Sequence, residues 1–237
     1  MIWWIVAAFC AYFVKGLCGF ANTLVFTSIL SFGNNNVNIS PVELLLSYPS
    51  NLILAVKERR SIEWKICLPL SLLVIAGSIP GAFFLKNADT GIIKLIFGAV
   101  IIFIGVEMFF REFQTKKAEQ SKVLLVIIGV LSGILCGLYG IGALLGAYLG
   151  RVTEDNSAFK ANICVVFAVE NTFRIILYGF WGILNLAILK QVLVFVPFML
   201  AGLIAGIFSG KFLDEKIVKK LVIILLIVSG IALILDH

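Results

Sequence analysis

The 237-residue chain is 61% hydrophobic and only 14% charged, with a mean hydropathy of +1.11 and a formal net charge of +6. One soluble core of this length cannot bury so much apolar surface, so the composition excludes a soluble domain and predicts an all-α polytopic membrane protein. The basic residues lie in short loops beside apolar segments, which excludes nucleic acid as a partner and favours contact with membrane lipid.

The first half of the chain, residues 1–114, contains four apolar segments. The first, residues 2–32, has no basic start, so we expect no cleaved signal peptide. It is interrupted at its glycines by the sequence KGLCGF, and each arm of about 14 residues is too short to cross the hydrocarbon core. We predict a re-entrant hairpin there. The next three segments, which we predict to be transmembrane helices, are residues 42–56, 66–85 and 92–110.

The loop 111–121 is the longest charged stretch, and it joins the first half to a second one, residues 121–237. The second half begins with an apolar segment, residues 123–150, that is interrupted by CGLYGI. Its three further segments are residues 161–180, 186–210 and 217–235. We therefore expect one membrane domain made of two repeats.

Identical residues recur at a constant spacing in the last two segments of each half, which indicates a duplication. Asn51 also recurs, as Asn171, 120 residues later. The pairs that lie 125 residues apart are Gly77 and Gly202, Gly81 and Gly206, Asp89 and Asp214, Lys94 and Lys219, and Gly105 and Gly230.

The distribution of Lys and Arg predicts how the two halves are oriented. If the first segment of each half is re-entrant, fourteen basic side chains fall on one side of the membrane and three on the other. Eight crossing segments would give nine and eight, which is no bias. We therefore predict two inverted repeats, each a broken-helix hairpin followed by three transmembrane helices, with both termini outside the cell.

Glycine-broken segments in matching positions of two halves are typical of a transporter binding site at the membrane midplane. Helix N-termini at such breaks present N–H groups and partial positive charge, which suits an anion such as a sulfonate, sulfite or carboxylate. The predicted substrate-binding residues are Gly16, Gly19, Asn22, Asn51, Gly137, Tyr139, Gly140, Asn171 and Arg174. The alternative for the glycines is close packing of helices.

Two further ionisable residues belong to this hypothesis. Lys15 is the only charge in residues 1–32, and it either attracts the anion or reaches back to the membrane surface. Glu170 lies one helical turn before Arg174, so these two side chains either form a structural ion pair or serve transport, with Glu170 as the proton-coupling group. Glu43 is expected near a membrane interface, without a role in the site.

The remaining motifs exclude a metal centre and leave three other functions open. The five cysteines show no CxxC spacing, and the single histidine is the last residue, so we expect no metal and no cofactor. A thiosulfate-type carrier would use Cys18 and Cys136, which lie at the two breaks. An anion channel would use the same hairpins. An intramembrane enzyme is disfavoured because no HExxH, GxSxG or paired-Asp motif occurs in the apolar segments.

The chain resembles the TauE/SafE family of sulfite and organosulfonate exporters. The resemblance rests on the two glycine-broken segments, Pro41 at the start of the second segment, the basic loop 57–65, and the matched sequences GSIPG at 77–81 and GLIAG at 202–206. It implies a secondary transporter in the bacterial inner membrane. We expect it to export a small anion such as sulfite, sulfonate or sulfoacetate by alternating access coupled to protons. A second copy of the chain is a plausible partner.

Overall fold

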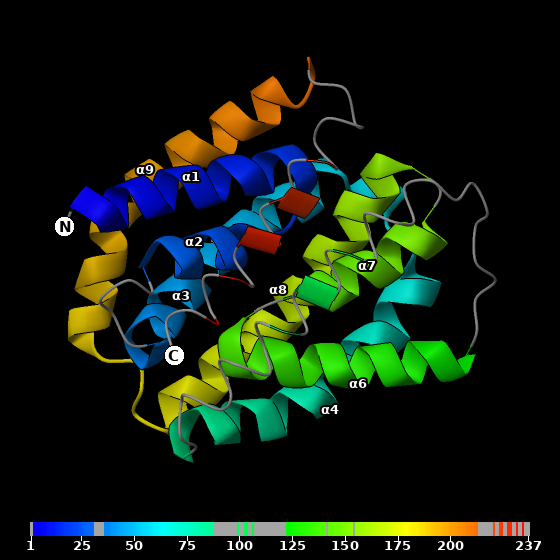
Figure 1. Ribbon diagram of the computed structural model, residues 1–237, viewed down its shortest axis with the longest axis horizontal. Helices are drawn as coiled ribbons and strands as arrows, with labels where there is room; N and C mark the ends of the chain where they lie inside the picture. Colours follow the sequence, from blue (N-terminus) through cyan, green and yellow to red (C-terminus); the bar gives the residue numbers. More distant parts are fainter. Residues whose placement is uncertain are drawn as a thin grey trace.

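The computed structural model describes residues 2–30, 36–87, 122–140, 142–153 and 155–212, and isolated positions at 99, 102, 103, 106, 220, 223, 224, 227, 228, 231 and 234 (Figure 1). Within these residues every regular element is a helix, which confirms the all-α class. The helices are α1 (Ile2–Cys18), α2 (Asn22–Leu30), α3 (Asn36–Lys57), a 3₁₀ turn (Arg59–Ser61), α4 (Trp64–Asn87), α6 (Lys122–Tyr139), α7 (Ala143–Val152), α8 (Asn156–Phe180) and α9 (Leu186–Ser209).

In the described part of the chain four helices, α3, α4, α8 and α9, are long and apolar enough to cross a membrane. They correspond to the predicted transmembrane segments 42–56, 66–85, 161–180 and 186–210. The other two predicted transmembrane segments, 92–110 and 217–235, lie mostly outside the described residues. With 24 residues, α4 and α9 each reach about 36 Å, which exceeds the roughly 30 Å of a hydrocarbon core.

The first apolar segment of each half is broken where the glycines predict a break. In the first half α1 ends at Cys18 and α2 begins at Asn22, and in the second α6 ends at Tyr139 and α7 begins at Ala143. Contacts join α2 to α1 and α7 to α6. Because α2 has 9 residues and α7 has 10, each reaches only about 15 Å and cannot cross the membrane alone.

The helix end at each break is built in the same way, 121 residues apart. Gly19 has a φ of +86° and Gly140 a φ of +71°, the left-handed region in which a side chain is strained. The Gly19 N–H donates to the Lys15 carbonyl at 2.6 Å, and the Gly140 N–H donates to the Cys136 carbonyl at 2.7 Å. The same glycine-terminated helix end is therefore built twice.

The helices pack in pairs that correspond between the two halves. Helix α1 lies against α9, α4 lies against α6, and α3 packs against α8 in the middle of the molecule (Figure 1). Glycines allow both outer pairs to approach backbone to backbone. A Cβ on Gly206 of α9 would lie 3.0 Å from the Cα of Gly16, and a Cβ on Gly81 of α4 would lie 3.1 Å from the Cα of Gly137.

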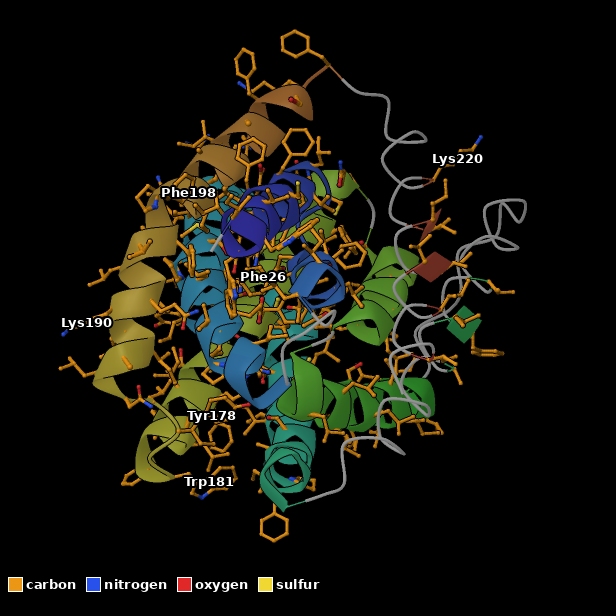
Figure 2. All side chains as sticks on the ribbon, turned by 60° about the vertical axis from the view of Figure 1, so that its left-hand side comes forward. Phe26, Tyr178, Trp181, Lys190, Phe198 and Lys220 are labelled. Atoms are coloured by element: carbon orange, nitrogen blue, oxygen red, sulfur yellow. The ribbon has the colours of Figure 1, made fainter. Side chains whose placement is uncertain are left out.

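Large apolar side chains cover the outside of this bundle, as expected of helices in lipid. Leu193 of α9 and Phe180 of α8 are among the most exposed of them. Figure 2 shows Phe26 of α2 between the helices and Lys190 pointing outward from α9. Polar side chains are concentrated in the interior instead, beside the two breaks.

Candidate functional site

Within the described residues, four acidic or basic side chains lie in the interior of the bundle, all at most 1% exposed. Lys15 comes from α1, Glu43 from α3, and Glu170 and Arg174 from α8. Burying charges away from water is costly, and in a membrane such residues usually face a pathway or a binding site. Their formal charges balance, because two are basic and two are acidic.

The sequence assigned Glu43 no role in the site, but the structure buries its side chain among the polar residues there. Helix α3 begins at Asn36, so Glu43 is its eighth residue and lies at the start of its third turn, where the N-terminal residues of α2 cover it. Glu43, Ser47 and Asn51 follow each other at intervals of four residues and therefore share one face of α3. This polar stripe was the signal in the sequence that could have placed Glu43 in the site.

The Glu43 carboxylate is held by two donors from the start of α2. Its Oε1 accepts hydrogen bonds from Asn22 Nδ2 at 2.5 Å and from Thr23 Oγ1 at 2.8 Å. Its Oε2 lies 3.9 Å from Arg174 Nη2, at the limit of an ion pair. Charge-assisted hydrogen bonds are normally shorter than this, so the Arg174 guanidinium is held only loosely by Glu43.

Lys15 is fully buried, which excludes the alternative that it reaches back to the membrane surface. Its Nζ donates to Ser47 Oγ at 3.1 Å and lies 5.9 Å from the centre of the Tyr12 ring. The Ser47 Oγ also accepts hydrogen bonds from Asn22 Nδ2 at 3.2 Å and from Asn51 Nδ2 at 3.4 Å. Three donors therefore meet at one hydroxyl oxygen, so this region of the site is rich in N–H groups.

Arg174 forms the ion pair with Glu170 that their spacing predicts, with 3.8 Å between Nε and Oε1. Its Nη1 donates to the Cys136 carbonyl, and the guanidinium lies 5.8 Å from the centre of the Tyr178 ring. Neither Arg174 Nε nor Glu170 Oε1 has a hydrogen-bond partner within the described part of the chain. Arg174 therefore retains capacity to bind another acceptor.

Gly140 explains how Arg174 reaches the second break. A Cβ at this position would lie 3.0 Å and 3.1 Å from the two terminal nitrogens of Arg174, and 3.2 Å from Glu43 Oε2. The missing side chain and the positive φ allow the backbone of the break to touch the charged cluster.

A small cavity lies where the two breaks meet, between the start of α2 and the residues just before α7. The amides of a helix's first turn have no partners within their helix, and the helix dipole places positive potential there. Among the described residues, Asn171 Nδ2 has no hydrogen-bond partner, and this side chain is 4% exposed. The lining residues are Ala21, Asn22, Thr23, Leu24, Glu43, Ser47, Gly140, Gly142, Phe167 and Asn171.

The residues predicted for the site fall into three groups. Asn22, Gly140 and Asn171 line the cavity, and Lys15, Asn51 and Arg174 contact residues that do. Gly16, Gly19 and Gly137 do not line it: Gly16 and Gly137 lie in helix contacts, and Gly19 packs on the side chain of Lys160. The side chain of Tyr139 lies outside the described residues. The prediction missed Thr23, Glu43, Ser47 and Phe167.

None of the cysteines is among the cavity-lining residues. The Cys18 thiol donates to the carbonyl of Val14 at 3.0 Å and to that of Phe20 at 3.2 Å, and the Cys164 thiol donates to that of Gly19 at 3.5 Å. These thiols bond to the backbone near the first break instead. In the part of the chain that the structure describes, no group of three or more His, Cys, Asp or Glu side chains is placed to hold a metal ion.

One protein family matches nearly the whole chain. Its sequence model, described as sulfite exporter TauE/SafE, matches residues 4–233. No curated protein and no solved structure matches the chain. Together with the long apolar helices, the family match indicates a multi-pass membrane protein.

Proposed function

Because the chain belongs to the TauE/SafE family of sulfite exporters, a family of membrane transporters, we propose that it carries small sulfur-containing anions through the cavity at the two breaks. Sulfite, sulfonates and sulfoacetate are the substrates that we propose. The transport is export across the cell membrane, coupled to protons.

The observation that carries this proposal is the convergence of hydrogen-bond donors and positive potential on the cavity. The N-terminal turn of α2 and the residues that precede α7 both line it, and each helix start places positive potential there. The Asn171 amide nitrogen lacks a hydrogen-bond partner among the described residues. Lys15 and Arg174 add positive charge beside the cavity, because Lys15 contacts the lining residue Ser47 and Arg174 contacts the lining residue Gly140. A sulfur oxyanion has several oxygens that can accept hydrogen bonds from such donors.

The arrangement of the helices supports alternating access by two inverted repeats. The pair α1 and α9 corresponds to the pair α6 and α4, and α3 corresponds to α8 between them. Inverted repeats of this kind allow a carrier to open to either side by equivalent movements around a fixed site. In this structure the cavity is small and its charged neighbours are buried, as expected of a closed state.

A flux assay in proteoliposomes tests the proposal. Labelled sulfite, a sulfonate and a carboxylate are compared, each with and without a pH gradient. We expect saturable flux of the sulfur anions. This flux should be faster when the imposed pH gradient is oriented so that proton movement drives it. Absence of saturable flux for every sulfur anion would contradict the proposal, and flux with single-channel currents and no dependence on the gradient would indicate a channel.

The variant Asn171→Ala tests the site itself. A hydrogen bond to a charged group is worth about 1.5–3 kcal/mol, so the affinity for sulfite should fall by roughly 10-fold to 100-fold. Thr172→Val is the matched control, because Thr172 is the next residue on α8, is exposed, and bonds only to the Ala168 carbonyl of its own helix. Equal affinities in the two variants would remove Asn171 from the site.

A further inference from the structure

We propose that Glu43 is an internal anion whose place the transported anion takes, so that one proton is bound to Glu43 for each anion bound. The inference rests on the proposed function and deepens it. It assigns proton coupling to Glu43 on α3 and not to Glu170 on α8.

The first argument is that Glu43 already occupies the donors that an oxyanion would use. Its Oε1 accepts hydrogen bonds from Asn22 Nδ2 and Thr23 Oγ1 at the start of α2, and its Oε2 faces Arg174. A carboxylate and a sulfonate or sulfite share this chemistry, because each presents anionic oxygens to N–H and O–H donors. An anion that enters the cavity therefore competes with Glu43 for the same groups.

The second argument is electrostatic. Two negative charges about 4 Å apart repel by roughly 4 kcal/mol at the effective dielectric near protein charges, so an ionised Glu43 would weaken anion binding strongly. A proton on Glu43 removes this repulsion and frees Arg174. Among the described residues, the ionisable groups that face Glu43 are Lys15 and Tyr12 of α1, Cys136 of α6, and Arg174, Glu170 and Tyr178 of α8. The side chains of α2 that contact it are neutral, and the described buried residues of α9 are apolar.

The third argument distinguishes the two buried glutamates. Glu43 lines the cavity, whereas Glu170 does not, and Glu170 is 3.8 Å from Arg174 Nε on the same helix. With Lys15 and Arg174 charged, the empty cluster is neutral. It is neutral again when it holds one monoanion and one added proton, so transport of a monoanion should be electroneutral.

Proton uptake during anion binding tests the inference. Methanesulfonate is the probe, because a sulfonate keeps its charge between about pH 5 and about pH 8 and any proton taken up is then bound by the protein. We expect the wild-type protein to take up about one proton per methanesulfonate, measured with a pH-indicator dye, and to accumulate the anion in proteoliposomes when a pH gradient is imposed.

The variant Glu43→Gln mimics the protonated side chain without changing its shape. We expect it to bind methanesulfonate without proton uptake and to let it equilibrate, while a pH gradient no longer drives accumulation. Glu58→Gln is the matched control, because Glu58 lies in the loop after α3 and pairs with Lys57 at 3.0 Å. This control should couple as the wild type does.

An infrared measurement keeps the test decisive if Glu43→Gln does not fold. Methanesulfonate binding to the wild type should produce a protonated-carboxyl band in difference spectra, and Glu43→Asp should shift the frequency of that band. The inference would be overturned if the wild type transports the anion without proton uptake, or if a pH gradient still drives accumulation in Glu43→Gln. It would also be overturned if the band is absent, or if it is unchanged in Glu43→Asp. Each of these results would leave the proposed function intact. Failure of the wild type to move any sulfur anion would overturn both.

Discussion

Replacing Gly140 by Ala should destabilise the protein more than the same change at Gly19, although both glycines have positive φ. At either position the left-handed backbone strains an added Cβ by about 1–2 kcal/mol. At Gly19 the nearest atom is Lys160 Cγ, at 2.8 Å, in a half-buried side chain that can relieve the contact by changing its first torsion. The cost there should be the backbone strain plus about 0.5–1.5 kcal/mol for this torsion.

At Gly140 the neighbours cannot move as easily. The added Cβ would lie 3.0 Å and 3.1 Å from the terminal nitrogens of Arg174, whose guanidinium donates to the Cys136 carbonyl. It would also lie 3.2 Å from Glu43 Oε2. Overpacking of a tight interior typically costs about 1–3 kcal/mol, so the total for Gly140→Ala should be about 2–5 kcal/mol.

Equilibrium unfolding in mixed detergent micelles, followed by tryptophan fluorescence, measures these differences. Gly179→Ala is the control, since nothing lies within 4 Å of a Cβ at this position and its φ is not positive, and its stability should stay within about 0.5 kcal/mol of the wild type. Because the Cβ at Gly140 would displace both Arg174 and Glu43 beside the cavity, this variant should also lose sulfite affinity. If Gly140→Ala is no less stable than Gly19→Ala, Arg174 is not held against the second break and the description of the site is wrong.

Three other changes probe separate parts of the structure. Lys15→Met should lower sulfite affinity by about 10-fold or more, since it removes a buried charge that contacts the cavity lining. Lys190→Met, on the outer surface of α9, is the control and should leave the affinity unchanged. Flux titrated against sulfite concentration measures both affinities. Gly206→Ala should destabilise the protein by about 1–3 kcal/mol in the same unfolding assay, because its Cβ would meet the backbone of α1, and a stability equal to that of the wild type would contradict this packing. Cys18→Ala and Cys136→Ala should retain sulfite flux, because neither residue is among those that line the cavity; loss of flux in both would favour a thiol-based carrier.

The breaks could be predicted from the sequence because their cause is local. Glycine clusters inside apolar segments mark positions where a helix can end in a left-handed residue, and both Gly19 and Gly140 do so. The long helices could be predicted equally well, since α3, α4, α8 and α9 correspond to runs of apolar residues in the sequence. Each of these features depends on residues within about one helical turn or one helix length of each other.

The role of each glycine and the partners of Glu43 could not be predicted, because both depend on tertiary contacts. Gly16 and Gly137 lie beside the breaks in the sequence, yet their Cα atoms face α9 and α4, and nothing local distinguishes them from Gly140. The face that Glu43 shares with Ser47 and Asn51 could be read from their spacing. Only the packing of α2 against α3 brings the donors of α2 to this face.

The two breaks share a left-handed glycine at the helix end but not their charges, and this difference bears on how the carrier works. Lys15 lies four residues before the left-handed Gly19, and the corresponding residue of the second break is Cys136, whose carbonyl binds Arg174 from α8. Each break therefore has one cation, supplied by the hairpin in the first half and by the next helix in the second. Glu43 contacts the start of α2 at the first break and faces Arg174 at the second. A symmetric scaffold can give two accessible states of similar energy, while these few side chains make the two sides of the site unequal. Different affinities for the anion on the two sides then need no asymmetry in the helices themselves.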